Sequence, residues 1–226
     1  MDKISFVLVH GAWHGGWCWR RVADKLTQMG HRVFTPTLTG LGARSHLLSP
    51  EVNLTTHVTD IVNVIRWEEL KDVVLCGHSY GGMVVTGVAD RMAERIASLV
   101  YLDAFVPESG QSMHDLRPRE LPRGLTMAPI PAEVCKINER DRGWIDRQCT
   151  PQPIASMTEK LTLTGAYRAV RRKVYIRALD YPSPAFEPTY ERLKADPGWT
   201  AHALPCGHDV MVDMPDALAE LLAAAL

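Results

Sequence analysis

The stretch from Val73 to Gly82 reads Val-Val-Leu-Cys-Gly-His-Ser-Tyr-Gly-Gly and joins two different patterns. Val73–Cys76 is a short apolar run typical of a buried strand, and Tyr80–Ala93 is expected to form a helix. The Gly-x-Ser-x-Gly motif between them occurs by chance in about one chain in twelve of this length. Directly between a strand and a helix, it is typical of a nucleophile elbow, which lifts a serine hydroxyl above the sheet edge. The setting predicts that Ser79 is a nucleophile rather than part of an ordinary glycine turn.

Short apolar runs alternate with helical spacing along most of the chain. This alternation favours an α/β fold with a doubly wound, mostly parallel sheet and helices on both faces. We expect Gly30 to end the first helix and Asp213 to cap the last one, with Pro215 in its first turn. The expected strands are Ile4–Val9, His31–Thr35, Val73–Cys76, Ser98–Leu102, Val174–Ile176 and Thr200–Leu204, and the expected helices before the last one are Trp17–Met29, 54–65 and Tyr80–Ala93.

Residues 106–170 interrupt the alternation. The segment is rich in proline, from Pro107 to Pro153, and carries scattered arginine and glutamate. We expect it to pack as a small cap or lid over the carboxyl edge of the sheet, where the ligand sites of α/β proteins lie. No internal repeat or low-complexity tract divides the chain, so residues 1–226 are expected to form one domain with the cap inserted in it.

The charge is nearly balanced, with 25 Lys plus Arg, 26 Asp plus Glu and a net charge of −1 over 226 residues. Nucleic-acid binding needs a basic face to neutralise phosphates, so no nucleic-acid partner is expected. No apolar run approaches the roughly 20 residues that cross a bilayer, and no secretory signal is recognisable, which predicts a cytoplasmic protein without a membrane partner. The five cysteines include no Cys-x-x-Cys pair, as expected for unpaired thiols in a reducing compartment. A homodimer is compatible with this composition.

A serine hydroxyl needs a general base, and the base needs an orienting carboxylate. His208 follows the last expected strand, in a loop that should open on the same sheet edge as the elbow. Two acids fit the chain order Ser…Asp…His: Asp103 ends the strand Ser98–Leu102, and Asp180 follows the strand Val174–Ile176. Asp103 lies in an apolar setting, where a carboxylate is costly unless it is paired. Asp180 lies in a loop rich in Tyr and Pro, where it could be a solvated turn residue.

The first expected strand leads into the glycine-rich turn His10-Gly-Ala-Trp-His-Gly-Gly-Trp17. Such a turn can aim backbone N–H groups at a developing oxyanion, most simply those of Ala12 and Tyr80. A phosphate-binding loop fits less well, because the Gly-x-Gly-x-x-Gly and Gly-Lys-Ser/Thr patterns are missing. His10 and His14 flank glycines in a loop, so no metal site is predicted. A site built from a hydroxyl, an imidazole, a carboxylate and backbone donors works without a cofactor, so no cofactor is predicted.

Four motifs resemble, in order, those of the α/β-hydrolase superfamily: His10–Trp19, Gly77–Met83, Leu102–Pro107 and Gly207–Met211. The chain is most similar to small esterases like the plant salicylate methyl esterases and hydroxynitrile lyases. The resemblance covers the whole chain except the insertion. It implies that Ser79 is the nucleophile, that His208 is the base, and that Ala12 and Tyr80 supply the oxyanion hole.

The chain departs from the plant relatives at the acid, which they place in a loop after the strand matching Val174–Ile176. Asp180 lies one residue too early for that position, whereas Asp103 stands where those relatives carry an apolar residue. Similar bacterial sequences have the Leu-Asp-Ala-Phe stretch and often lack the later acid, so the resemblance favours Asp103. The lyase branch needs a lysine just after the base, where this chain has Asp209, which argues against a lyase.

The leading prediction is a serine carboxylesterase that hydrolyses a small hydrophobic or aryl ester through an acyl-enzyme intermediate. The alternatives are a hydroxynitrile-lyase-like enzyme that does not hydrolyse, and a small-molecule receptor on a hydrolase fold. An apolar pocket favours a hydrophobic acyl or alkyl group. The candidate pocket residues, each of which could also be simple core, are Trp13, Phe105, Leu125, Met127, Trp144 and Met211.

Overall fold

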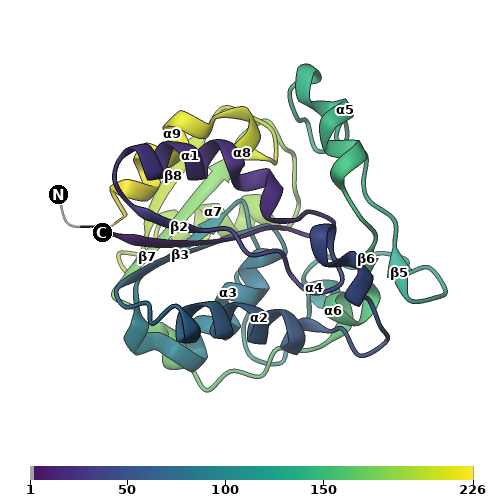
Figure 1. Ribbon diagram of the computed structural model, residues 1–226, viewed down its shortest axis with the longest axis horizontal. Helices are drawn as coiled ribbons and strands as arrows, with labels where there is room; N and C mark the ends of the chain where they lie inside the picture. The colour runs from purple at the N-terminus through teal and green to yellow at the C-terminus, as the bar shows by residue number, and fades with distance from the viewer. Residues whose placement is uncertain (1–2, 226) are drawn as a thin grey trace.

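A computed structural model describes residues 3–225 and shows a six-stranded sheet in the order β2-β1-β3-β4-β7-β8 (Figure 1). Every neighbouring pair of these strands runs parallel, which confirms the predicted doubly wound sheet. The strands are β1 (Ser5–Val9), β2 (Arg32–Phe34), β3 (Val73–His78), β4 (Ile96–Leu102), β7 (Arg172–Ala178) and β8 (Thr200–Leu204).

Helices cover both faces of the sheet, as predicted. In Figure 1, α1, α8 and α9 lie on one side, and α2 and α3 lie on the other. A further helix, α7, packs along β7 and β8. These helices are α1 (Arg20–Gln28), α2 (Leu54–Trp67), α3 (Gly81–Met92), α7 (Phe186–Lys194), α8 (Val210–Asp213) and α9 (Pro215–Ala223).

The strand register brings the carboxyl ends of the central strands to one edge. Val9 pairs with Gly77, His78 pairs with Leu102, and Leu102 pairs with Ile176. The first residues after β1, β3 and β4 therefore lie close together at this edge, as expected for a ligand site of an open α/β sheet.

Between β4 and β7 the chain leaves the sheet: residues 113–158 lie at this carboxyl edge, and residues 166–169 return along α3 (Figure 1). We call residues 106–170 the cap segment. Arg21 of α1 and Asp141 of the cap segment form a bidentate ion pair with N···O distances of 2.8 and 2.7 Å, which ties the two together. The cap segment contains α4 (Met113–Leu116), β5 (Thr126–Met127), α5 (Glu139–Gln148), β6 (Gln152–Pro153) and α6 (Ile154–Thr158), with β5 and β6 antiparallel.

Some element boundaries differ from those expected. A 3₁₀ turn over Gly16–Trp19 precedes α1, and Gly30, at φ 91°, ends it as predicted. The prediction that Asp213 caps the final helix is wrong, because Met214 is the N-cap residue. Asp213 Oδ1 instead accepts hydrogen bonds from the backbone N–H (3.1 Å) and the side-chain amide (2.6 Å) of Asn138. The Asp213 carboxylate thus binds the cap segment instead of capping the helix.

One apolar core joins the sheet to both helical layers and continues under the cap segment. All five cysteines are free, and four of them are buried. Across residues 3–225, none of the helices has the length and apolar character needed to cross a lipid bilayer.

Candidate active site

Ser79 lies in a strained turn between β3 and α3. Its φ is 53°, in the left-handed region that residues other than glycine rarely adopt. The turn is tight because glycines flank it: a Cβ on Gly77 would lie 2.5 Å from the carbonyl oxygen of Gly81, and one on Gly81 would lie 2.7 Å from that of Val9. A side chain at either position would push the helix away from the sheet. This geometry is typical of a nucleophile elbow.

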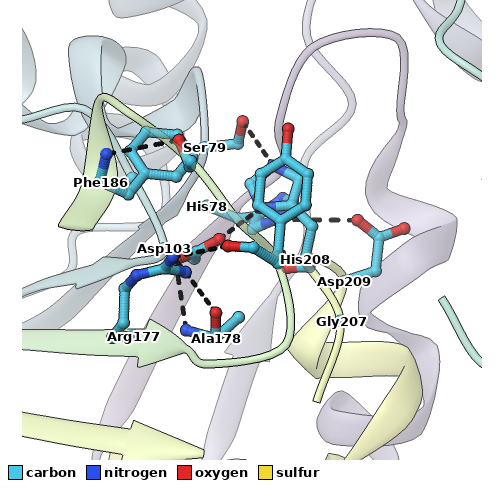
Figure 2. Close-up of polar contacts among 12 residues, drawn as sticks. His78, Ser79, Asp103, Arg177, Ala178, Phe186, Gly207, His208 and Asp209 are labelled. Carbon is cyan, nitrogen blue, oxygen red and sulfur yellow. Dashed lines mark hydrogen bonds and ion pairs between the residues drawn. The ribbon is translucent and has the colours of Figure 1, made fainter. Parts of the chain in front are cut away.

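Ser79, His208 and Asp103 form one hydrogen-bonded chain (Figure 2). His208 Nε2 lies 3.0 Å from Ser79 Oγ, and His208 Nδ1 lies 2.6 Å from Asp103 Oδ2. A carboxylate accepts, so Nδ1 carries the ring hydrogen and Nε2 is free to accept the hydroxyl hydrogen. All three side chains are buried, with exposed fractions of 8%, 7% and 0%. Such a chain can convert a serine hydroxyl into a nucleophile.

Asp103 is held by contacts that leave one oxygen for His208. Its backbone φ is 42°, and its N–H donates to the Ile176 carbonyl at 2.7 Å. Oδ1 accepts from Arg177 Nη1 at 2.6 Å and from the Ala178 N–H at 3.2 Å. Arg177 is only 1% exposed, so a buried positive charge balances the buried carboxylate (Figure 2).

Asp180, the alternative acid, lies elsewhere. Its side chain is exposed, and its backbone N–H donates to the Cys206 carbonyl at 3.0 Å. The structure thus brings Asp103 to His208, while Asp180 lies in the loop after β7.

Packing on several sides fixes the position of His208. Its backbone N–H donates to the Cys135 carbonyl at 2.9 Å, and its own carbonyl accepts from His78 Nε2 at 3.0 Å. The ring stacks on Tyr181, with centroids 4.4 Å apart, and on Phe186, with centroids 5.6 Å apart. His208 is therefore held by both the sheet loops and the cap segment.

Two backbone donors face no acceptor near Ser79. Among the residues that the structure describes, the N–H groups of Ala12 and Tyr80 have no hydrogen-bond partner. The carbonyl of Gly11, on the same peptide as the Ala12 N–H, accepts from His10 Nδ1 at 2.8 Å, and His10 Nε2 accepts from Leu38 N–H at 3.0 Å. Burial lowers the pKa of His10 to about 3, so the ring is neutral, as these bonds require. The two free donors suit a developing oxyanion.

A second neutral histidine, His57, fixes the Tyr80 side chain. His57 Nδ1 lies 2.8 Å from the Tyr80 hydroxyl, and His57 Nε2 lies 2.9 Å from the Thr39 carbonyl. The carbonyl can only accept, so Nε2 donates to it, and the Tyr80 hydroxyl donates to Nδ1. Burial lowers the pKa of His57 to about 4, consistent with a neutral ring. Sequence reasoning gave this histidine no catalytic role.

A narrow cavity of about 20 Å³ adjoins Ser79 and has room for about one water molecule. Its roof belongs to the cap segment, and the turn after β1, the elbow residues His78 and Ser79, and His208 form the rest. The lining residues are Ala12, Trp13, His14, His78, Ser79, Ile130, Ala132, Cys135, Ile137, Ile145, Cys149 and His208. The six roof residues were missed because the cap segment has no regular periodicity that tells an inward side chain from an outward one.

Of the six predicted pocket residues, only Trp13 lines this cavity. Phe105 packs edge-on against Phe186, with centroids 4.9 Å apart, and Met211 is fully buried in α8. Trp144 turns toward the body of the protein and packs edge-on against Trp17, with centroids 5.1 Å apart. Of the other two, Leu125 precedes β5 and is 38% exposed, and Met127 ends β5, where its carbonyl accepts from Trp13 Nε1 at 3.1 Å.

A separate hollow of about 620 Å³ lies between β2 and α2. Phe34, Asp60 and Trp67 are among its lining residues, and neither Ser79 nor His208 reaches it. Residues 3–225 contain no group of three or more His, Cys, Asp or Glu side chains placed to hold a metal ion.

Arg177→Met should destabilise the fold by about 3–5 kcal/mol, because it leaves the Asp103 carboxylate buried without its ion-pair partner. Urea unfolding followed by circular dichroism measures the loss. Arg168→Met is the matched control, since the Arg168–Glu108 pair (2.8 Å) is largely exposed and screened by solvent, so its loss should leave the free energy of unfolding nearly unchanged. Equal losses in the two variants would contradict the importance of the buried pair.

Residues 6–221 match the model of the alpha/beta hydrolase family. The chain belongs to the α/β-hydrolase family. The hydrolase is 49% identical to a carbendazim-hydrolysing esterase of a Nocardioides species, over 97% of this chain and 98% of that protein. It is 34% identical to methylesterase 2 of Arabidopsis thaliana, over 49% of this chain and 43% of that protein.

A solved structure of an extracellular α/β-hydrolase from a Paenibacillus species aligns with a TM-score of 0.83, at 25% identity over 99% of both chains. That protein is described as sharing structural and functional homology with tobacco salicylic acid binding protein 2. The family match and the esterase relatives show that the hydrolase is an enzyme of the carboxylic ester hydrolase class.

Proposed function

We propose that the hydrolase is a serine carboxylesterase in which Ser79 is the nucleophile, His208 the general base and Asp103 the orienting acid. One observation carries the proposal: His208 lies 3.0 Å from Ser79 Oγ and 2.6 Å from Asp103 Oδ2 at the same time. The free N–H groups of Ala12 and Tyr80 support it, because acyl transfer needs donors for an oxyanion.

The reaction has two halves. Ser79 Oγ attacks the ester carbonyl while His208 Nε2 takes the hydroxyl proton, and the tetrahedral oxyanion is stabilised by the N–H groups of Ala12 and Tyr80. His208 then gives the proton to the departing alkoxide, which leaves an acyl-enzyme. Water, deprotonated by His208, hydrolyses the acyl-enzyme and frees the acid and Ser79. Asp103 stays ionised and stabilises the imidazolium that forms twice.

The substrate we propose is a small, uncharged ester with an apolar or aryl group. The roof of the cavity is aliphatic and thiol-lined, and Trp13 adds an aromatic wall. A cavity of about 20 Å³ holds no ester, so the cap segment has to shift to admit one. The Nocardioides relative hydrolyses carbendazim, a methyl carbamate of a flat benzimidazole, and we propose that this hydrolase accepts esters of similar shape.

A substrate panel tests this. We expect turnover of p-nitrophenyl butyrate and p-nitrophenyl benzoate, and release of 2-aminobenzimidazole from carbendazim. An anionic ester such as p-nitrophenyl hemisuccinate should have a kcat/KM at least about tenfold lower, because a charge is costly in an apolar site. The p-nitroanilide of butyric acid serves as the matched amide control. Preference for the anionic ester would contradict the proposed substrate class, and cyanide release from mandelonitrile without ester turnover would favour a lyase.

A further inference from the structure

A second buried ion pair lies beside the Ser79–His208 chain and takes no part in it. Asp209 follows His208 directly, is fully buried, and lies beside His208 and His78 (Figure 2). Its Oδ2 is 2.9 Å from Nε2 of His14, in the glycine-rich turn after β1. The other ring nitrogen of His14, Nδ1, lies 2.8 Å from the carbonyl oxygen of Ala12.

Both partners of the His14 ring are acceptors. A carbonyl has no hydrogen to donate, and an ionised carboxylate only accepts. A neutral imidazole donates from one nitrogen alone, so it would set a lone pair of His14 against either Ala12 or Asp209. A ring with hydrogen on both nitrogens satisfies both contacts.

The charges around His14 also favour a ring with hydrogen on both nitrogens. Burial by itself would lower the pKa of His14, but the charge of Asp209 and the hydrogen bond to it raise the pKa above its ordinary value. Burial opposes ionisation of Asp209 as well, yet His14 holds the pKa of that carboxyl well below its usual range. The proton therefore resides on His14.

Burial keeps three titratable neighbours of the pair, His78, His10 and Cys18, neutral. Burial and the proximity of His208 lower the pKa of His78 well below its ordinary value, and burial lowers the pKa of His10 to about 3. Burial raises the pKa of the Cys18 thiol. Trp17 stacks on the His14 ring with centroids 5.3 Å apart. His14 is thus the positive member of this cluster, and it lines the cavity while Asp209 lies behind it.

We propose that His14 is a constitutively protonated positioning residue, held by Asp209, that fixes the glycine-rich turn after β1 and places a buried positive charge beside the oxyanion. Its Nδ1–H holds the carbonyl of the Ala12–Trp13 peptide, while the N–H of that peptide donates to Gln152 Oε1 at 2.9 Å. Trp13 itself is held at φ 66°. With this peptide fixed at both ends, the preceding Ala12 N–H keeps its direction, as preorganised stabilisation requires. The effect on rate rests on the proposed function, whereas the protonation does not.

The protonation is tested by nitrogen-15 NMR of the histidine rings, which needs no substrate. At pH 7.5 we expect one ring to carry hydrogen on both nitrogens, and His14→Gln should remove that signal. In Asp209→Asn the same ring should become neutral. His31→Gln is the control, because His31 is buried just before β2, away from the site, and its loss should leave the signal in place.

The positioning role is tested by kinetics per titrated active site. Asp209→Asn should lower kcat about 10- to 100-fold, less than the 10²–10³ lost with an oxyanion donor, while KM changes little. The inhibition constant of an aryl boronic acid, whose adduct with Ser79 is tetrahedral, should rise by the factor by which kcat/KM falls. A purely structural role would reduce the folded fraction without changing kcat per active site.

A neutral His14 ring in the unmodified hydrolase overturns the inference, and so does an Asp209→Asn variant that keeps kcat within twofold. If Asp209→Asn does not fold, the spectra of the unmodified chain and of His14→Gln still decide the protonation, and the kcat of His14→Gln decides the positioning role. If no ester is turned over at all, the proposed function is wrong, and the NMR signal of the ring still decides whether His14 is protonated.

Discussion

Ser79→Ala should abolish ester hydrolysis. We expect kcat to fall about 10⁶-fold, because losing the nucleophile of a Ser-His-Asp site costs about as much as losing the whole triad. Ser79 Oγ lies 3.0 Å from the base, so its removal leaves His208 with no hydroxyl to activate. Donors of the oxyanion hole should leave a residual rate of the order of 10³ above that in water. Initial rates with p-nitrophenyl butyrate at high enzyme concentration measure the loss.

Ser98→Ala is the matched control for this loss. Ser98 is also a buried serine, it lies on β4, and its hydroxyl has no partner among the described residues. Both substitutions remove one oxygen atom, yet we expect Ser98→Ala to keep kcat within about twofold. Alanine keeps the backbone preferences of serine closely enough that Ser79→Ala should hold its melting temperature. Near-normal turnover by folded Ser79→Ala would contradict the role of this residue.

The central sheet and the elbow could be predicted because both depend on local sequence. The apolar run Val73–Cys76 specifies a strand. The Gly77–Gly81 segment that follows specifies a tight turn and the start of a helix, and the structure has β3 and α3 there. Parallel strands place their carboxyl ends at one edge, which brings His208 to Ser79 across 129 residues.

The cap segment could not be predicted in the same way. Its position depends on single long-range contacts, such as Arg21 with Asp141 and Trp13 with Gln152. No periodic pattern in the sequence predicts such contacts. Trp144 was expected in the pocket but packs on Trp17, because α5 turns this ring toward the body of the protein. Hydrophobicity alone does not tell an apolar residue that lines a cavity from one that seals an interface.

In the sequence, Arg177 is a signal that distinguishes the two candidate acids, Asp103 and Asp180. This arginine ends the run Val174-Tyr-Ile-Arg177, and a charged side chain inside a buried strand requires a buried counter-ion. Asp103, at the end of the neighbouring strand, is that counter-ion at 2.6 Å. The pairing of β4 with β7 makes the contact, and strand order is not written in any local motif.

Asp103→Asn should lower kcat about 10⁴-fold, whereas Asp180→Asn should leave kcat within about twofold. An asparagine at 103 no longer stabilises the imidazolium and can hold His208 in the wrong tautomer. The two substitutions are chemically identical, and Asp180 is exposed, so each serves as the control of the other. Rates on p-nitrophenyl butyrate, per titrated active site, measure both. A large loss in Asp180→Asn with little loss in Asp103→Asn would transfer the role of the acid to Asp180.

Asp103→Asn has a second consequence that has to be separated from the first. It leaves the Arg177 guanidinium, only 1% exposed, with the half-exposed Glu187, 3.2 Å from its Nε, as its one remaining carboxylate, which should cost up to about 3–5 kcal/mol of stability. The double variant Asp103→Asn/Arg177→Met removes both charges, so its free energy of unfolding should recover part of that loss. Its kcat should stay about 10⁴-fold low, because the base still lacks its carboxylate. If the double variant regained activity together with stability, Asp103 would act on the fold and not on His208.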